Sequence, residues 1–426
     1  MRSPAVERFD TLDGLRGVAA FSVMIGHFGQ VLGSYWPAHM FLAVDVFFVM
    51  SGFVIAHSYR ERLRGGMSAW TYLSRRLVRL YPLFILGLLL GAGILYYGAS
   101  RGVIAYRTDD ILRSVALNAL YIPFLNRAQI YIDIGQIFPA DPPAWSLFLE
   151  MLASAGFLVL FDLRRKALML VTALCYLALI GAGFYFGRVN GAAGLDISNG
   201  FDSHNFLGGV PRVGFGFTLG ILLHALTRDG IGTQRAAAVL RRVPYPSFVL
   251  YAALAAMFLF PNTVRGLYPL LALATVAPAI VFIGAQLRTG PGLETDVARF
   301  LGWVSYPVYC LHVPILRLVI FARGGVHGSA LLVTAFSGSR DARLGRPADA
   351  LVRRTPARRA VGPPVCRPAP PRPVDRLNEA SLLRQLARER QRVEDRAADA
   401  ASAPNWRSRS RRSPHASCRC PHSPGT

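Results

Sequence analysis

Nine segments of this sequence are long and apolar enough to cross a lipid bilayer as helices, and no other feature constrains the fold as strongly. A helix needs about 20 mostly apolar residues to span the hydrocarbon core. Apolar residues make up 53% of the 426 positions, more than a soluble domain of this size can bury. The sequence therefore predicts an all-α, polytopic transmembrane helical bundle. The nine segments lie near residues 15–35, 40–57, 77–98, 144–161, 167–187, 206–226, 245–260, 268–287 and 300–322.

The basic residues between these segments predict how the helices are oriented. Short cytoplasmic loops are enriched in Lys and Arg. Segment 111–125 is ambiguous, and the side of every later loop depends on whether it crosses the membrane. The basic clusters all lie on one side only if it does not cross, so we predict that residues 99–143 form an outer loop. The N-terminus is then cytoplasmic, and its apolar run, which lacks a convincing cleavage site, is a retained first helix. The clusters are Arg60, Arg62, Arg64, Arg75 and Arg76; Arg164, Arg165 and Lys166; and Arg228, Arg235, Arg241 and Arg242.

The C-terminal part of the chain departs from this pattern. A tenth apolar run begins near Val326 and stops after about twelve residues, too few to span. We therefore predict a membrane domain over residues 1–337, with an incomplete last helix, and a basic Arg/Pro/Ala-rich tail over 338–426 that cannot form a core. Either this tail is disordered, or the reading frame is lost near Ser337, as the break inside a helix and the single lysine of the chain suggest.

Ionisable side chains within a membrane segment are costly, so they are candidates for function. His27 lies well inside the first segment, and Arg16 lies eleven residues earlier, which places both on one helix face. A neutral histidine is able to take the proton of a hydroxyl that attacks a thioester, which is general base catalysis. The alternative is a histidine that only packs between helices.

Two further groups of charged residues occupy the second and third segments. Asp45 interrupts an apolar run, so it must find a cation or hydrogen-bond donors. It either orients a histidine, pairs with an arginine such as Arg16, or forms a purely structural salt bridge. Arg75, Arg76 and Arg79 lie at the predicted cytoplasmic start of the third helix, where guanidinium groups suit the phosphates of acyl-CoA. The alternative is an ordinary topology signal.

The fourth segment begins at the predicted outer surface with Trp145, Ser146 and Glu150. Ser146 and Glu150 share a helix face, and Glu150 is expected about one turn below that surface. These residues suit the binding of sugar hydroxyls or proton transfer, or else form an interfacial anchor. Arg212 and His312 are further buried polar candidates, for which packing or a salt bridge is the alternative.

Several of these stretches together resemble the acyltransferase type three family of bacterial inner-membrane enzymes. Members O-acylate lipopolysaccharide, peptidoglycan, exopolysaccharide, Nod factors and some antibiotics. The resemblance implies ten membrane helices, an acyl-CoA donor, an essential histidine at the position of His27, and third-helix arginines that serve the donor. The matching stretches are Leu12-Asp13-Gly14-Leu15-Arg16-Gly17 with His27, Val44-Asp45-Val46-Phe47-Phe48-Val49-Met50-Ser51-Gly52-Phe53, Arg75-Arg76-Leu77-Val78-Arg79-Leu80-Tyr81-Pro82, Trp145-Ser146-Leu147 with Glu150, and Ser305-Tyr306-Pro307 with Leu311-His312.

The sequence thus predicts a multi-pass acyltransferase of the bacterial inner membrane. It moves an acyl group, in the simplest case acetyl, from the co-substrate acyl-CoA to a hydroxyl of a cell-envelope saccharide, with no other cofactor, no metal and no nucleic acid. The alternatives are a transporter or flippase and an inactive truncated remnant. The sequence does not identify the acyl group, the acceptor or the oligomeric state. It also does not distinguish direct transfer from a relay through an acyl-histidine. The expected catalytic residues are His27, Asp45 and Glu150, and the expected substrate-binding residues are Arg16, Arg75, Arg76, Arg79, Trp145, Ser146 and His312.

Overall fold

The computed structural model describes residues 8–32, 39–102, 107–125, 135–189, 194–230, 234–261 and 266–322. The regular secondary structure of these residues is helical, and one isolated antiparallel bridge joins Gln136 to Asp202. The described residues therefore confirm the predicted all-α class. The predicted tenth helix from Val326 and the predicted tail over residues 338–426 lie outside the described ranges.

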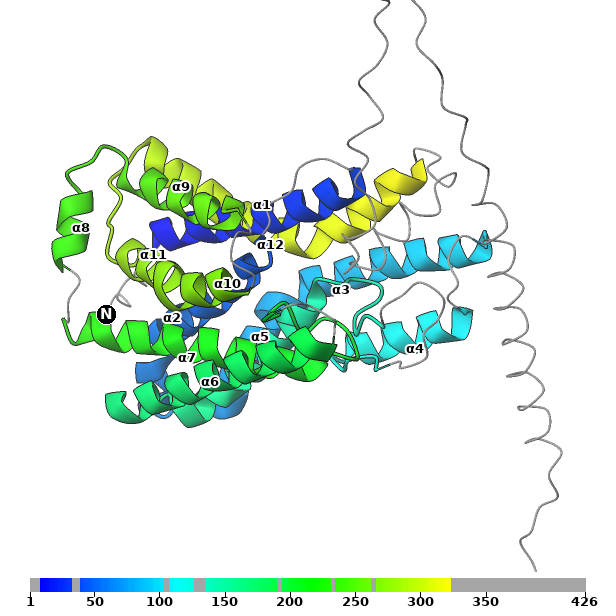
Figure 1. Ribbon diagram of the computed structural model, residues 1–426, viewed down its shortest axis with the longest axis horizontal. Coiled ribbons are helices and arrows are strands. Elements are labelled where there is room, and N and C mark those ends of the chain that lie inside the picture. The colour runs from blue at the N-terminus through cyan, green and yellow to red at the C-terminus, as the bar shows by residue number, and fades with distance from the viewer. Residues whose placement is uncertain are drawn as a thin grey trace, which may run out of the picture. The chain divides into compact units, whose positions relative to one another are not determined.

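All nine predicted membrane segments fall on helices (Figure 1). Six helical stretches are long and apolar enough to cross a membrane, and α5 and α9 are shorter apolar helices. The protein is thus a multi-pass membrane protein, while the count of nine crossings stays a prediction. The helices are α1 Asp10–Leu32, α2 Leu42–Arg64, α3 Ala69–Ser100, α4 Thr108–Ala119, α5 Ala144–Leu160, α6 Arg165–Val189, η1 Phe206–Gly208, α7 Gly209–Arg228, α8 Gln234–Leu240, α9 Pro246–Leu259, α10 Leu267–Leu271, η2 Ala272–Val276, α11 Ala277–Gly284 and α12 Leu293–Ala322.

Two local features follow directly from the sequence. The ambiguous segment 111–125 contains only the 12-residue helix α4, about 18 Å long, which is too short to cross the bilayer core. α10, the π-helical turn η2 and α11 follow one another without a gap and form one helical stretch, which η2 interrupts in its middle. η2 ends two residues before Pro278, which has no backbone N–H to continue the regular hydrogen-bond ladder.

Glycines let two pairs of distant helices pack closely. α1 lies along α12 (Figure 1), and a Cβ added at Gly17 would come within 2.5 Å of Leu301. α2 lies along α7, where a Cβ at Gly52 or Gly220 would lie 2.1 Å from a backbone carbonyl of the other helix. Small residues at such contacts are typical of membrane helices. This packing brings the helix that carries Arg16 and His27 against the helix that carries His312.

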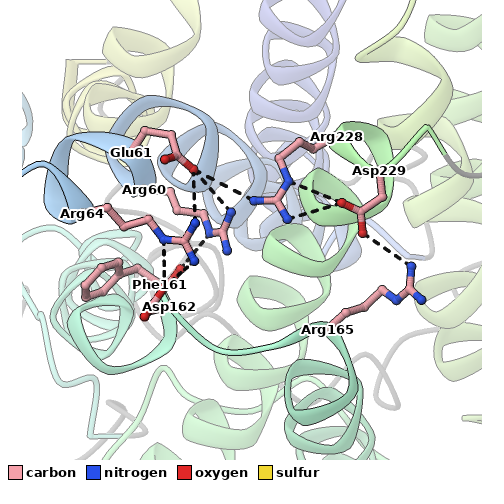
Figure 2. Close-up of polar contacts among 8 residues, drawn as sticks. All are labelled: Arg60, Glu61, Arg64, Phe161, Asp162, Arg165, Arg228 and Asp229. Atoms are coloured by element: carbon pink, nitrogen blue, oxygen red, sulfur yellow. Dashed lines mark hydrogen bonds and ion pairs between the residues drawn. The ribbon is translucent and has the colours of Figure 1, made fainter.

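The predicted basic clusters of three helix connections come together at one end of the bundle, which we call the basic side. Figure 2 shows Arg60 and Arg64 of α2 beside Asp162 of the α5–α6 turn, and Arg228 of α7 between Glu61 and Asp229. All of these residues except Glu61 line a cavity of about 580 Å³. The grouping agrees with the charge pattern of the sequence, while the cytoplasmic location of this side stays a prediction.

Candidate active site

A second cavity of about 470 Å³ lies between α1, α2, α3, α5 and α12, and we call it the central cavity. Five of the ten predicted site residues line it: Arg16, Arg76, Arg79, Ser146 and Glu150. They come from three helices, α1, α3 and α5, so the tertiary packing brings together side chains that are up to 134 residues apart in the sequence. Much of the remaining wall is apolar.

Glu150, which is partly buried, and Arg76, which is buried, form an ion pair in the wall of the central cavity. Nη2 of Arg76 lies 2.5 Å from Oε1 of Glu150, and the hydroxyl of Ser51 donates to the same oxygen at 2.8 Å. Both of these hydrogen bonds use Oε1, which leaves Oε2 as the oxygen available to a bound molecule. Glu150 is the seventh residue of α5, at the end of the second turn of that helix.

The contact corrects the expectation that Arg76 and Glu150 serve opposite sides of the membrane. The sequence pattern starts the third span at residue 77, whereas α3 begins at Ala69 and extends over 32 residues. Arg76 therefore lies about 10 Å inside the helix rather than at its start. Arg79 is one turn further along and also lines the cavity, but Arg75 is exposed and does not.

Arg16 is held against α12 at the edge of the same cavity. Its Nε donates to the hydroxyl of Ser305 at 3.2 Å, and its Nη2 donates to Asp13 at 3.0 Å and to the carbonyl of Gly302 at 3.4 Å. These bonds fix the guanidinium group next to the cavity. Ser305 belongs to one of the stretches that carry the family resemblance.

The partner of Asp45 is Arg212, not Arg16. Nε and Nη2 of Arg212 donate to the two carboxylate oxygens at 2.7 and 2.8 Å, and both side chains are almost fully buried. Arg212 also donates to the carbonyls of Asn199 and Phe41. Trp145 covers the guanidinium at 5.3 Å, so its ring packs on this ion pair rather than lining the cavity. The sequence predicts that both charged residues are buried, but it does not show that they pair, because they are 167 positions apart.

His27 and His312 contact each other beside the central cavity. Nε2 of His312 lies 3.3 Å from Nδ1 of His27, and the ring centroids are 5.0 Å apart. Neither residue lines the cavity, but Tyr309 does, and its ring lies 6.1 Å from that of His312. The Tyr309 hydroxyl is hydrogen-bonded to that of Ser146 at 2.6 Å. Tyr309 therefore connects the cavity wall to the histidine pair.

Two buried charged residues near this site were not expected. Arg317 donates to the carbonyls of Pro139 and Ala140 at 2.9 and 3.1 Å and is only 1% exposed. The sequence feature that could have identified Arg317 is its charge within a predicted membrane segment, five positions after His312. Asp141, just before α5, is fully buried, and its carboxylate oxygens have no hydrogen-bond partner among the described residues. Burial raises the pKa of Asp141 well above its ordinary value, and Arg317 opposes that shift.

These features define a multi-pass membrane protein with a histidine pair between its helices and a cavity whose wall combines charged and apolar side chains. A family model described as an acyltransferase domain matches residues 9–337, so the chain belongs to this acyltransferase family, as the sequence motifs predict. The family supports an enzyme of acyl transfer in the membrane.

The chain is similar to two curated proteins, one of which is named as an acyltransferase. The chain is 26% identical over 359 residues to a protein named acyltransferase MdmB from Streptomyces mycarofaciens, a match that covers 77% of this chain and 84% of the relative. It is 37% identical over 161 residues to protein 2 in the picA locus of Rhizobium radiobacter, which covers 35% of this chain and 80% of the relative. No solved structure matches the chain.

Proposed function

We propose that the protein transfers an acyl group, in the simplest case acetyl, from acyl-CoA to a hydroxyl of a cell-envelope saccharide in the bacterial inner membrane. The observation that carries this proposal is the central cavity, which combines Arg16, Arg76, Arg79 and Glu150 with apolar walls between membrane helices. An arginine-lined cavity suits a polyanionic donor, because guanidinium groups donate paired hydrogen bonds to phosphates.

The donor enters from the basic side in this proposal, which we take as cytoplasmic. Arg8 and His57 line the central cavity near the ends of α1 and α2 that belong to this side. Arg79 makes no ion pair with another described residue, so it is the arginine best able to bind a phosphate, whereas Arg76 is already paired with Glu150. Arg75, which is exposed six residues into α3 and does not line the cavity, attracts the donor from outside it.

Transfer then needs a base for the acceptor hydroxyl. His27 takes the hydroxyl proton while the oxygen attacks the thioester carbon, and the proton passes to the departing CoA thiolate as the C–S bond breaks. Glu150 accepts a hydrogen bond from the acceptor hydroxyl through Oε2. The acceptor arrives from the predicted outer side of the membrane, where Ser146 and Trp145 lie. Asp45 supports the site through Arg212. A covalent acyl-histidine relay uses the same residues.

The experiment that tests the proposal replaces His27 with Ala. Membranes that contain the protein are incubated with radiolabelled acetyl-CoA and candidate envelope glycans, and label in the glycan is measured. His27→Ala should abolish transfer while the protein still inserts into the membrane. His224→Phe, which changes a histidine of α7 that does not line the central cavity, should retain it. Transfer by His27→Ala at the normal rate would overturn the assignment of the base, and glycan transport without label transfer would favour a transporter.

A further inference from the structure

The hydrogen bonds of the histidine pair determine where its protons lie. Nδ1 of His312 is 3.0 Å from the carbonyl oxygen of Val308 and 2.9 Å from that of Tyr309. A carbonyl oxygen only accepts hydrogen bonds, so Nδ1 of His312 carries the proton. The neutral ring therefore has its lone pair on Nε2, the atom that faces His27.

The same reasoning applies to His27. Its Nδ1 lies 2.9 Å from the carbonyl oxygen of Val23, which makes this nitrogen a donor as well. The Nδ1–H is then shared between the Val23 carbonyl and Nε2 of His312 at 3.3 Å. With Nδ1 protonated, the basic lone pair of His27 is on Nε2, at the far side of the ring from His312.

We infer that His312 is a positioning residue for His27: it accepts a hydrogen bond from Nδ1–H, fixes the tautomer and ring orientation, and leaves Nε2 of His27 as the base. This inference rests on the proposed function. It replaces the expectation from the sequence that His312 binds substrate. The structure supports the new role because His312 is only 2% exposed, whereas the side chain of His27 is partly exposed.

The interaction strengthens during the reaction. When Nε2 of His27 takes the hydroxyl proton, the ring becomes a cation, and Nδ1–H becomes a charge-assisted donor to the neutral His312. A histidine acceptor achieves this without placing a carboxylate in the membrane interior. Orienting partners of this kind typically contribute 10- to 100-fold where they have been tested in metal sites.

The other charges around the pair are identified. Arg317, further along α12, is the cation whose field acts on His27, and Asp141 faces Arg317 in turn. Tyr309 is the titratable neighbour of His312 on its own helix, and its hydroxyl is bonded to Ser146. A buried cation near His27 opposes protonation of the base, which increases the need for an acceptor at Nδ1.

Three variants of His312 test the inference, with CoA release from acetyl-CoA in the presence of an accepted glycan as the assay. His312→Leu removes the acceptor. His312→Gln and His312→Asn are a matched pair of amides, because the Gln side chain reaches the position of Nε2 and the Asn side chain only that of Nδ1. Each variant is compared per amount of folded protein, judged by size-exclusion chromatography and thermal unfolding in detergent.

We expect His312→Leu and His312→Asn to lower kcat by about 10- to 100-fold, with the KM for acetyl-CoA within about twofold of the unchanged protein. His312→Gln should retain most of kcat. The acid limb of the kcat–pH profile should move to lower pH in the Leu variant, because the His27 cation loses its acceptor.

Three results would overturn the inference. One is normal kcat per folded protein in His312→Leu, another is a Gln variant as impaired as the Asn variant, and the third is a raised KM with unchanged kcat, which would indicate substrate binding. No acyl transfer by the unchanged protein would instead refute the proposed function, and this inference with it.

Discussion

The Asp45–Arg212 pair and the ionic network of the basic side use the same chemical groups in opposite environments. Asp45 and Arg212 are almost fully buried and joined by two hydrogen bonds. At the basic side, Arg64 and Asp162 are 40% and 64% exposed. A buried charge that loses its partner is strongly destabilising, whereas an exposed ion pair contributes little. The comparison teaches that burial, and not the number of ion pairs, decides which charges this fold depends on.

The largest effect should come from breaking the buried pair. Asp45→Ala leaves the Arg212 cation buried with only carbonyl acceptors, and we expect it to lower the free energy of unfolding by about 3–5 kcal/mol. Thermal and denaturant unfolding in detergent would measure the loss. The double variant Asp45→Leu/Arg212→Met removes both charges and should be clearly more stable than the single variant. A loss below about 1 kcal/mol for Asp45→Ala would show that burial does not have this weight here.

The Glu150–Arg76 pair is intermediate, because Arg76 is buried, Glu150 is only partly buried, and both line the central cavity. Glu150→Gln keeps the side-chain volume and an acceptor for Ser51, yet removes the negative charge opposite Arg76. We expect kcat/KM for acyl transfer to fall by about 10- to 100-fold, the size of a hydrogen bond to a charged group. Steady-state kinetics would test this, with Asp162→Asn at the basic side as the matched control. Equal activities of the two variants would contradict a role for the cavity pair.

Asp141 should give a smaller effect that depends on pH. Because burial raises its pKa in the folded protein, its folded state holds a proton that the unfolded state releases above pH of about 4. Stability should therefore fall as pH rises, and Asp141→Asn should not show this loss. The melting temperature of the Asn variant minus that of the unchanged protein should grow between pH 5 and pH 8. A constant difference would indicate that Asp141 is ionised and paired.

The smallest effect should come from the basic side. Arg64→Ala breaks the exposed pair with Asp162 shown in Figure 2, and the expected loss of stability is at most about 1 kcal/mol. Raising the salt concentration should reduce even this difference, because exposed charges are screened. A loss comparable to that of Asp45→Ala would remove the distinction between the two regions.

Much of the fold could be predicted because the membrane imposes it on the sequence. Each membrane span must be a long apolar helix, so length and composition predicted the positions of nine helical segments. The same criteria separated them from the shorter segment that contains α4. Helix starts were less certain. α3 begins at Ala69, before its apolar stretch, and its first turns contain polar and basic residues. Arg76 is therefore inside the helix, where it pairs with Glu150, and the apolar pattern alone does not predict this.

The sequence by itself determined the helical membrane fold, the family, and the identity of the charged residues that a lipid environment makes conspicuous. Periodicity also placed Arg16 and His27 on one helix. Only the tertiary structure decided the partners: Arg212 for Asp45, Arg76 for Glu150 and His312 for His27. The physical reason is that apolarity and helical period act along one helix, whereas an ion pair or hydrogen bond between helices depends on their relative rotation and depth. Close contacts at glycines fix the rotation and depth of neighbouring helices, and the linear sequence does not show which helices meet at those glycines.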